Sequence, residues 1–220
     1  MKRPSYHTRS VLERVVPKYC RGYVLDAGAG RAKYKQLIHK HSTNYVALDN
    51  LSSSFQFSYK LDHKLDVIGD IMSLPFRSEV FDTVVCTQVI EHVPEPRKLM
   101  HELSRVLKRG GYLILSTGWV SPYHPEPKDY YRFSVDALVY LLTAESLEVV
   151  EIIPQGGVLL ITLYFWSRLI ELHHPRLFHF LYNSKVLRVT ELVCEGLEQL
   201  PLFHFGKKDA VGYTVVGFKP

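Results

Sequence analysis

The chain of 220 residues is long enough for one sizeable domain or two very small ones. Hydrophobic residues make up 46% of the sequence and charged residues 22%, which excludes an intrinsically disordered chain. The 27 Lys and Arg against 22 Asp and Glu give a formal net charge of +5, which suits anionic partners such as nucleic acid, phosphorylated metabolites or acidic lipid without selecting among them.

Short apolar runs alternate with amphipathic segments along most of the chain, and this alternation predicts an α/β sheet with helical crossovers. In the first part of the chain we expect strands at 23–26, 45–49, 66–70 and 81–86, and a helix at about 33–41. The run at 81–86 is almost wholly apolar, which is typical of a central strand buried on both faces.

An amphipathic helix is predicted at 96–108, because four apolar side chains form one stripe there: Leu99, Leu103, Val106 and Leu107. The pair Gly110 and Gly111 is expected to end that helix before a fifth strand. The elements expected next are the strand at 112–116, an irregular stretch at 117–133, a helix near 134–144 and a strand near 147–153.

From residue 156 to about residue 205 the pattern changes to helices alone. Segment 158–172 is apolar on nearly all sides, whereas 184–200 is amphipathic, and an alternating run at 211–219 predicts a last strand. We therefore expect one domain over 1–220, with its core at about 20–153 and 210–220 and a helical insertion at about 156–205.

The turn after the first expected strand reads Asp26-Ala27-Gly28-Ala29-Gly30-Arg31-Ala32. Glycines let the backbone turn sharply and approach a ligand closely. A dinucleotide fingerprint would need a third glycine where this chain has Lys33, and the Asp26 carboxylate would repel a pyrophosphate. A carboxylate at this place suits a cationic ligand instead; a plain glycine turn between strand and helix is the structural alternative.

This turn resembles motif I of class I S-adenosylmethionine-dependent methyltransferases, D-x-G-x-G-x-G, with Ala32 at the last glycine. Three further segments resemble the type 11 group of that family, and the resemblance covers about residues 20–120. The segments are Gly69 to Phe76 (G-D-x-x-x-L-P-F), Phe81 to Val93 (F-D-x-V followed by E-H-V) and Leu103 to Gly111 (L-x-R-V-L-K-P-G-G, with Arg109 in place of proline).

The resemblance implies a Rossmann-like α/β fold with a seven-stranded, mostly parallel sheet, helices on both faces, an antiparallel last strand and a helical insertion before it. It also implies that S-adenosylmethionine is the cofactor. Asp49 would accept both ribose hydroxyls, Asp70 would meet the adenine amino group, and Ile71 would cover the ring. The cofactor-binding residues expected on this basis are Asp26, Gly28, Gly30, Asp49, Asn50, Asp70, Ile71 and Gln88.

Methyl transfer is an in-line displacement, in which alignment and exclusion of water supply most of the acceleration. A general base is required only where the acceptor arrives protonated, as an alcohol or phenol does. His92, just past the fourth strand, is one candidate base. Its alternative role is structural, at the start of the next helix and packed against the cofactor loop.

Segment 121–134 resembles the H-x-x-P-x-D-Y-Y-R-F/Y-S/T signature of a bacterial and archaeal subset of type 11 enzymes. His124 and Tyr131 in this segment are the other candidate catalytic residues, and the loop is a candidate for contact with the acceptor. The structural alternative is a rigid lid held by an Asp129–Arg132 pair, with Ser134 as the N-cap of the following helix.

The helical insertion carries more apolar surface than a lid in water needs. Three explanations remain open: burial against the domain, a homodimer interface, or docking at a membrane surface or a lipid-like acceptor. The basic side chains that could meet lipid phosphates are Arg168, His173, His174, Arg176 and Lys185.

Only three cysteines occur, Cys20, Cys86 and Cys194, and no histidines or acidic residues stand at metal-ligand spacing. We therefore expect no metal and a reducing, cytoplasmic setting. No apolar segment follows the basic N-terminal residues, so no secretory signal is predicted. Attachment to the inner face of the membrane is the alternative location.

These features predict an S-adenosylmethionine-dependent methyltransferase that modifies oxygen on a small-molecule, sugar or lipid-like acceptor. Non-catalytic binding of the cofactor is the first alternative. A nucleic-acid methyltransferase is disfavoured, because Cys86 to Val89 stand where base-modifying members carry N/D-P-P-Y/F and no RNA-binding arm is visible. A nicotinamide-dependent reductase is disfavoured by Lys33.

Overall fold

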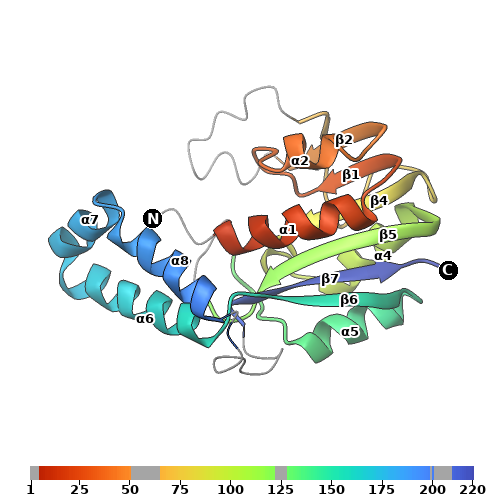
Figure 1. Cartoon of the computed structure of the whole chain (residues 1–220). Coiled ribbons are helices and arrows are strands. Elements are labelled where there is room, and N and C mark those ends of the chain that lie inside the picture. The colour runs from red at the N-terminus through yellow and green to blue at the C-terminus, as the bar shows by residue number, and fades with distance from the viewer. Residues whose placement is uncertain (1–4, 51–64, 122–127, 199, 201–209) are drawn as a thin grey trace. The chain divides into compact units, whose positions relative to one another are not determined.

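The computed structural model describes residues 5–50, 65–121, 128–198, 200 and 210–220. The chain forms two compact units, the first comprising Met1–Ile153 and Tyr213–Pro220, the second Pro154–Gly212. The first unit is built on a sheet with helices on both faces, and the described part of the second carries three helices (Figure 1).

The described strands form one seven-stranded sheet in the order β3-β2-β1-β4-β5-β7-β6. Their bounds are β1 (Tyr23–Ala27), β2 (Asn44–Asp49), β3 (Val67–Ile68), β4 (Phe81–Thr87), β5 (Leu107–Gly118), β6 (Glu148–Gln155) and β7 (Gly212–Phe218). Strand β1 pairs in parallel with β2 and β4, β2 pairs in parallel with β3, and β4 does so with β5. The apolar strand β4 is therefore central, as predicted.

Strand β7 lies between β5 and β6 and runs antiparallel to both. Near the start of β5, the Gly110 amide donates to the Lys219 carbonyl at 2.7 Å, and the Lys219 amide donates to the Gly111 carbonyl at 3.0 Å. At the other end of β7, the Val211 amide donates to the carbonyl of Gln155, the last residue of β6, at 3.0 Å. The expected mostly parallel sheet with an antiparallel last strand is confirmed.

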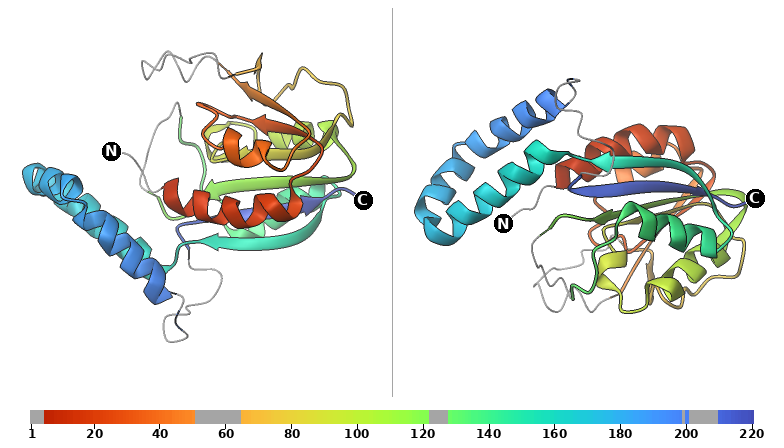
Figure 2. Two further views of the ribbon diagram at one scale, coloured as in Figure 1. Left: turned by 45° about the horizontal axis from the view of Figure 1, so that its top comes forward. Right: turned by 90° about the horizontal axis from the view of Figure 1, so that it is seen from below.

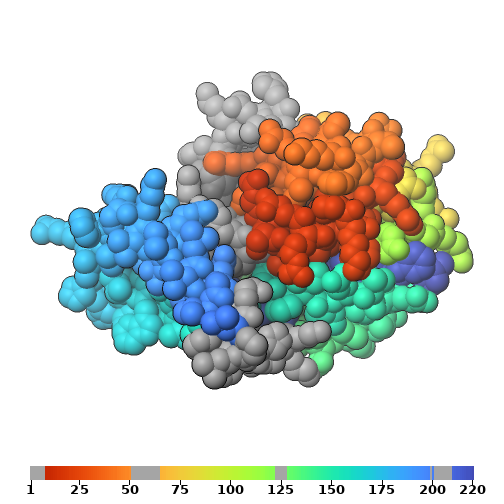
Figure 3. Space-filling model, viewed as in Figure 1, coloured from red at the N-terminus to blue at the C-terminus, as the bar shows by residue number. Residues whose placement is uncertain are grey.

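Helices cover both faces of this sheet (Figures 1 and 2). Helices α1 (Ser5–Tyr19) and α2 (Lys35–His39) lie on one face, and their surfaces adjoin in the space-filling view (Figure 3). Helices α4 (Pro96–Val106) and α5 (Val135–Ala144) lie on the other. The leucines that these two helices bury completely are Leu99, Leu103, Leu138 and Leu142.

Helix α1 is an element that the patterns described above do not predict, although its apolar residues follow a helical spacing. Those residues are Val11, Leu12, Val15, Val16 and Tyr19. They share a core cluster with Val24 of β1, Val85 of β4 and Ile114 of β5. Pro17 in the last part of the helix obscures the signal, because proline is disfavoured inside helices.

The predicted boundary between the helix at 96–108 and the strand at 112–116 is wrong. Helix α4 ends at Val106 instead of 108, and β5 begins directly at Leu107 instead of 112. Leu107 has extended backbone and pairs with Phe81 of β4, so burial of both side chains is gained by starting the strand early. Gly110, with φ of +75°, lies in the strand where the register between β4 and β5 shifts; it does not end the helix.

The second unit contains α6 (Val158–His173), α7 (Pro175–Asn183) and α8 (Val186–Glu198). Helices α6 and α8 lie side by side, and α7 connects them at one end (Figure 2). At the other end, Oε1 of Glu198 accepts a hydrogen bond from the Leu160 amide at 3.1 Å, so α8 caps the first turn of α6. Among the described residues, no helix has the length and apolar character needed to span a membrane.

Candidate active site

The turn that follows β1 lies against the ends of β2 and β4. The amides of Gly28 and Ala29 both donate to the Leu48 carbonyl in β2, at 2.9 and 3.0 Å. Gly28 has φ of +76°, and a Cβ atom on it would lie 2.5 Å from Cγ2 of Val89, just past β4. Glycine is therefore required here both for the backbone conformation and for the close approach of the two segments.

Asp49 closes β2 and ties the glycine turn to it. Its Oδ2 accepts a hydrogen bond from the Gly30 amide at 2.6 Å, and its Oδ1 accepts one from the Asn50 amide at 2.7 Å. Burial raises the pKa of Asp49, while these two hydrogen bonds oppose the rise. Each carboxylate oxygen has a second lone pair, so Asp49 can also accept hydrogen bonds from the hydroxyls of a ligand.

Asp26 is a carboxyl group with 2% of its surface exposed. Its Oδ2 accepts a hydrogen bond from the Tyr45 hydroxyl at 2.7 Å, whereas its Oδ1 has no hydrogen-bond partner among the described residues. Burial raises the pKa of Asp26 to about 6; the Tyr45 bond opposes the rise and the charge of Asp49 adds to it. Buried polar atoms in native proteins are almost always paired, so the orphaned oxygen marks a position that a cationic or donor ligand would complete.

The turn after β3 extends this edge of the sheet. The Gly69 amide donates to the carbonyl of Asp49 at 3.1 Å, which brings Asp70 next to β2. The Asp70 side chain is in solvent, where its Oδ1 accepts a hydrogen bond from the Met72 amide at 2.8 Å, and Ile71 is buried. An exposed acidic side chain, Asp70, thus precedes a buried apolar one, Ile71, at this edge of the sheet.

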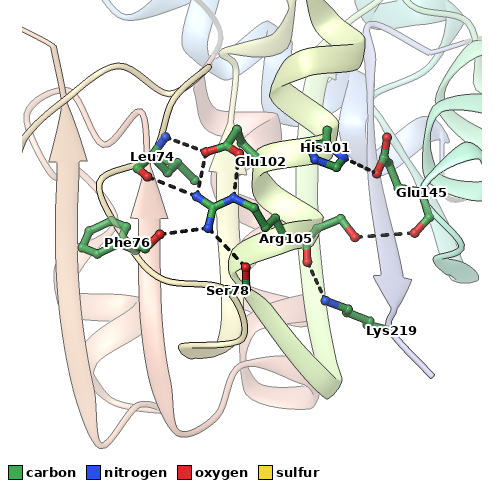
Figure 4. A network of polar contacts seen from close by, with 9 residues as sticks. Leu74, Phe76, Ser78, His101, Glu102, Arg105, Glu145 and Lys219 are labelled. Carbon is green, nitrogen blue, oxygen red and sulfur yellow. Dashed lines mark hydrogen bonds and ion pairs between the residues drawn. The ribbon is translucent and has the colours of Figure 1, made fainter.

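Two side chains of α4 hold the backbone just beyond that turn (Figure 4). Oε2 of Glu102 accepts a hydrogen bond from the Leu74 amide at 2.7 Å. Arg105 donates to the carbonyls of Phe76 at 2.9 Å and Leu74 at 3.1 Å, and its Nε donates to Glu102 at 2.7 Å. The L-P-F and R-V-L sequence segments are therefore in direct contact, and α4 sets the position of the turn that carries Asp70.

Gln88 follows the end of β4 with a φ of +56°. Its amide donates to the Ser116 carbonyl at 2.8 Å, and its side-chain Nε2 donates to Ser116 Oγ at 3.2 Å. The neighbouring Val89 is the residue that contacts Gly28. The eight residues expected to bind a cofactor therefore lie at the carboxyl ends of the first four strands, the edge where ligands bind in open α/β sheets.

Glu91 in the 3-10 turn η1 (Ile90–His92) joins this edge to the segment before α5. Its buried carboxylate accepts hydrogen bonds from Thr117 Oγ1 at 3.0 Å and from the Gly118 amide at 3.4 Å, and burial raises its pKa. Its backbone carbonyl accepts from the amides of Tyr130 at 2.9 Å and Tyr131 at 3.3 Å. One residue thus fixes the end of β5 and the D-Y-Y-R segment to each other.

The structure places two of the three candidate catalytic residues on this junction. Nδ1 of His92 contacts the carbonyl of Lys128, which puts a ring proton on Nδ1 and the lone pair of the neutral ring on Nε2. The Tyr131 hydroxyl donates to the Pro94 carbonyl at 3.0 Å. His124 lies outside the described residues.

The segment before α5 contains both the Asp129–Arg132 pair and the Ser134 N-cap that the structural alternative requires. Arg132 donates to both carboxylate oxygens of Asp129, and its Nε donates to the Ser121 carbonyl at 3.2 Å. Ser134 Oγ accepts from the Ala137 amide at 3.3 Å and so caps α5. These contacts hold residues 128–134 in place, and a segment held in this way can also present Tyr130 and Tyr131, both of which are exposed.

Sequence reasoning overlooked Tyr45 and the pair Glu102 and Arg105 as parts of the site. Tyr45 shares an alternation with Ala47 and Asp49 along β2, which places their side chains on one face of the sheet. The spacing of Glu102 and Arg105 on α4 indicates an ion pair, but their backbone partners at Leu74 and Phe76 could be found only from the fold.

Comparison with known proteins shows which family the residues around this edge of the sheet resemble. Residues 25–115 match the family described as methyltransferase domain, type 11. This part of the chain, less than half of it, is therefore similar to methyltransferase domains. The matched residues run from β1 to β5 and include every cofactor-binding position predicted above.

Curated relatives and solved structures show the same similarity. The ubiquinone biosynthesis O-methyltransferase of Xanthomonas oryzae is 29% identical over an alignment of 106 residues that covers 43% of this chain and 42% of that protein. A chain from the complex of the Haloferax volcanii Trm112 methyltransferase activator and a methyltransferase superposes with a TM-score of 0.60 at 16% identity, covering 98% of this chain and 90% of that one. Phosphoethanolamine N-methyltransferase 2 of Haemonchus contortus, solved with S-adenosyl-L-methionine, superposes with a TM-score of 0.59 at 16% identity. The superposition covers 98% of this chain and 52% of that one.

The first of the curated relatives are matched over only about two fifths of their own length, 39% and 42%. The remainder of the chain, the second unit included, lies outside the family match. Among the described residues, no group of three or more His, Cys, Asp or Glu side chains could hold a metal ion.

The geometry of the residues at this edge of the sheet fits S-adenosylmethionine. Asp26 offers a buried carboxylate oxygen without a partner among the described residues, which suits the cationic end of the cofactor. Gly28 and Gly30 leave no side chain over the turn, and Asp49 has acceptor capacity for hydroxyls. A pyrophosphate would be repelled by both carboxylates.

Proposed function

We propose that this protein transfers the methyl group of S-adenosylmethionine to an oxygen atom of a small-molecule, sugar or lipid-like acceptor. The observation that carries the cofactor part of the proposal is the unpartnered Oδ1 of Asp26 beside a turn in which Gly28 cannot be replaced without a clash. The family match and the O-methyltransferase relative support it.

In this proposal the cofactor lies along the carboxyl ends of β1 to β4. Asp26 holds its cationic methionine end, and Asp49 accepts hydrogen bonds from the ribose hydroxyls. Asp70 accepts from the adenine amino group, and Ile71 covers the ring. Gly28, Gly30, Asn50 and Gln88 complete the site with backbone and side-chain contacts. When bound, S-adenosylmethionine supplies an activated methyl group.

An oxygen acceptor that arrives as a hydroxyl must lose its proton as its bond to the methyl carbon forms. His92 is our first choice as the base. Its Nδ1 contact with Lys128 fixes the ring, so that a neutral imidazole would accept the proton at Nε2. His124 and Tyr131 are the other choices for this role, and Tyr131 would act there only after leaving the Pro94 carbonyl.

The segment at 128–134 is proposed as one wall of the acceptor site. It leaves Tyr130 and Tyr131 exposed on a backbone fixed by Glu91 and by the Asp129–Arg132 ion pair. Aromatic faces beside hydrogen-bonding groups suit an acceptor with an apolar body and a hydroxyl, as in a phenol or a lipid-linked sugar.

Calorimetry with S-adenosylmethionine and its demethylated product tests the cofactor part of the proposal. We expect binding to the wild-type protein, and a loss of at least about tenfold in affinity for Asp26→Asn and Asp49→Ala. Arg77→Ala, an exposed residue beyond the L-P-F segment, is the matched control and should bind normally. Absence of heat with either compound would overturn the proposal.

Transfer of a labelled methyl group onto polar and lipid extracts tests the reaction. We expect a labelled product whose methyl group is stable to mild base, as an ether is and a methyl ester is not. His92→Ala should lower turnover at saturating cofactor while leaving cofactor affinity unchanged. Binding without transfer to any fraction would favour the non-catalytic alternative, and full turnover by His92→Ala would remove His92 from the mechanism.

A further inference from the structure

The end of the second unit where α7 joins α6 to α8 carries a large exposed apolar surface. We call residues 165–189 the helical tip. Trp166, Leu172 and Phe180 are 60%, 62% and 66% exposed. The other large apolar side chains exposed on the tip are Phe165, Leu169, Leu177, Tyr182, Val186 and Val189. Soluble monomers rarely leave so many such side chains together in water, so this surface indicates an interaction site.

The exposed side chains are additional to the core of these helices. Phe178 is the one side chain that α7 buries, and its ring stacks on Tyr182 at 6.2 Å between centroids. Leu177 and Phe180 lie three residues apart and so share a different side of the helix. Helix α7 therefore has an inner apolar side that packs and an outer apolar side that is exposed.

Basic residues accompany the exposed apolar side chains. Between residues 165 and 189 the chain has four Lys and Arg (Arg168, Arg176, Lys185 and Arg188) and one acidic residue, Glu171, giving a charge of +3 with neutral histidines. Arg176 lies four residues before Phe180 and thus on the same side of α7. Three histidines, His173, His174 and His179, are exposed on the tip as well.

Within helices α6 to α8, the Lys and Arg residues all lie in this part of the sequence. After Arg188, α8 has no further Lys or Arg and carries Glu191, Glu195 and Glu198. Exposed apolar side chains continue along α8 at Leu192, Val193 and Leu197, but there they accompany acidic residues, so basic charge distinguishes the tip. A surface with Trp, Phe and Leu beside Lys and Arg is the composition that binds in the headgroup region of an anionic membrane.

We propose that the helical tip docks onto the surface of a bilayer that contains anionic lipid. Exposed aromatic and leucine side chains would enter the boundary between headgroups and acyl chains, while Arg176 and Lys185 would meet lipid phosphates. A second copy of the chain fits less well, because a two-fold contact through the tip would place a charge of +3 against another of +3. The proposal does not depend on the methyltransferase activity.

Flotation of the full chain with lipid vesicles tests the proposal. We expect binding to vesicles of phosphatidylcholine mixed with phosphatidylglycerol, little binding to phosphatidylcholine alone, and weakening by high salt. The double variant Arg176→Glu with Lys185→Glu should reduce partitioning by about 25-fold or more, and Phe180→Ser by about tenfold. Lys98→Glu on α4 and Tyr140→Ser on α5 are matched exposed substitutions in the first unit and should leave partitioning unchanged.

Two results would overturn the proposal. One is failure of the wild-type chain to float with any vesicle while it still binds S-adenosylmethionine by calorimetry. The other is flotation that the tip variants leave unchanged. Analytical ultracentrifugation in parallel tests whether a second copy of the chain covers the helical tip instead. A dimer that dissociates on Phe180→Ser, without vesicle binding, would assign the surface to a second copy.

Discussion

The hydroxyl of Tyr45 donates a hydrogen bond of 2.7 Å to Oδ2 of Asp26 and leaves the other carboxylate oxygen without a partner among the described residues. Tyr45 therefore stabilises the ionised form of Asp26 from one side, while burial favours the neutral form. The balance places the pKa of Asp26 at about 6. This carboxyl group is poised to change charge in the pH range where binding can be measured.

Affinity for S-adenosylmethionine should rise with pH through about 6, since a cationic ligand favours ionised Asp26. Tyr45→Phe removes the bond that lowers this pKa, and should move the midpoint upward by about one to two units. The measurement is the dissociation constant from pH 5 to 9. Tyr34→Phe removes another buried tyrosine hydroxyl, one that makes no hydrogen bond to Asp26, and should leave the midpoint in place. A profile unchanged by Tyr45→Phe would contradict this account.

The stability of the ligand-free protein should also depend on the ionisation of Asp26, but it should fall as pH rises, whereas the affinity for S-adenosylmethionine rises. The pKa of Asp26 is raised from 3.8 to about 6 on folding, so the folded state binds the proton more tightly and loses stability as pH rises between these values. Between pH 5 and pH 8 this loss amounts to about 1.4 kcal/mol. Asp26→Asn should abolish it, which urea unfolding at the two pH values can measure. An equal change with pH in both proteins would show that Asp26 is already ionised when the protein is free.

Gly28→Ala should destabilise the protein more than Gly110→Ala does. Both glycines have positive φ, +76° and +75°, so both substitutions strain the backbone by about 1 kcal/mol. Only at Gly28 does the new Cβ meet another atom, Val89 Cγ2 at 2.5 Å, whereas nothing lies within 4 Å at Gly110. The extra cost should be about 1–3 kcal/mol and should include loss of cofactor binding.

The double variant Gly28→Ala with Val89→Ala distinguishes backbone strain at Gly28 from the clash with Val89. Removing the Val89 methyl groups relieves the clash and leaves the backbone strain. Its unfolding free energy should therefore exceed the value expected from adding the two single effects by about 1 kcal/mol or more. Strict additivity would mean that the turn moves away from β4 and that close approach is not what requires glycine.

The sheet and its cofactor edge could be predicted because the signals are local. Each strand of the first half is a mainly apolar run, and the candidate cofactor-binding residues lie at or just past the carboxyl end of their own strands, as Asp26, Asp49 and Asp70 do. The parallel order then brings those strand ends together without further information. This is why the predicted cofactor positions share one edge of the sheet.

What could not be predicted depends on contacts between distant segments. Leu107 leaves the helical pattern because it gains a ladder partner in Phe81 of β4, which no local rule contains. The role of Glu91 as a joint between β5 and the D-Y-Y-R segment likewise needs the positions of Thr117 and Tyr130. The E-H-V pattern marked Glu91, but only the fold gives the physical reason for a buried carboxylate there.

Arg105→Ala should weaken cofactor binding although the side chain lies on α4, away from the ligand. It removes the hydrogen bonds to the carbonyls of Leu74 and Phe76, which hold the turn that carries Asp70 (Figure 4). We expect a loss of about 1–2 kcal/mol in stability and a several-fold loss of affinity, with turnover at saturating cofactor unchanged. Arg97→Ala on the same helix, whose partner is Tyr140, is the control.

Substitutions of Glu91 can distinguish effects on cofactor binding from effects on the reaction with the acceptor. Its carboxylate holds Thr117 and Gly118, and its backbone holds Tyr130 and Tyr131, yet it makes none of the contacts expected with the cofactor. Glu91→Ala leaves the Thr117 hydroxyl buried without this acceptor and opens a cavity, so a loss of about 2–4 kcal/mol in stability is expected.

Glu91→Gln keeps an acceptor oxygen for Thr117, gives up only the longer hydrogen bond from the Gly118 amide at 3.4 Å, and removes a carboxyl group whose pKa burial has raised. It should therefore retain most of the stability, because an amide is cheaper to bury than a carboxylate and the volume is unchanged. Affinity for S-adenosylmethionine should stay at the wild-type value in this variant. Turnover should stay within about threefold of wild type if Glu91 only positions the loop, and should fall by about 100-fold or more if its charge acts on the acceptor or on the neighbouring His92. Methyl transfer measured at saturating cofactor from pH 6 to 9 distinguishes the two outcomes, and the geometry favours the first, since both carboxylate oxygens of Glu91 already accept hydrogen bonds from β5.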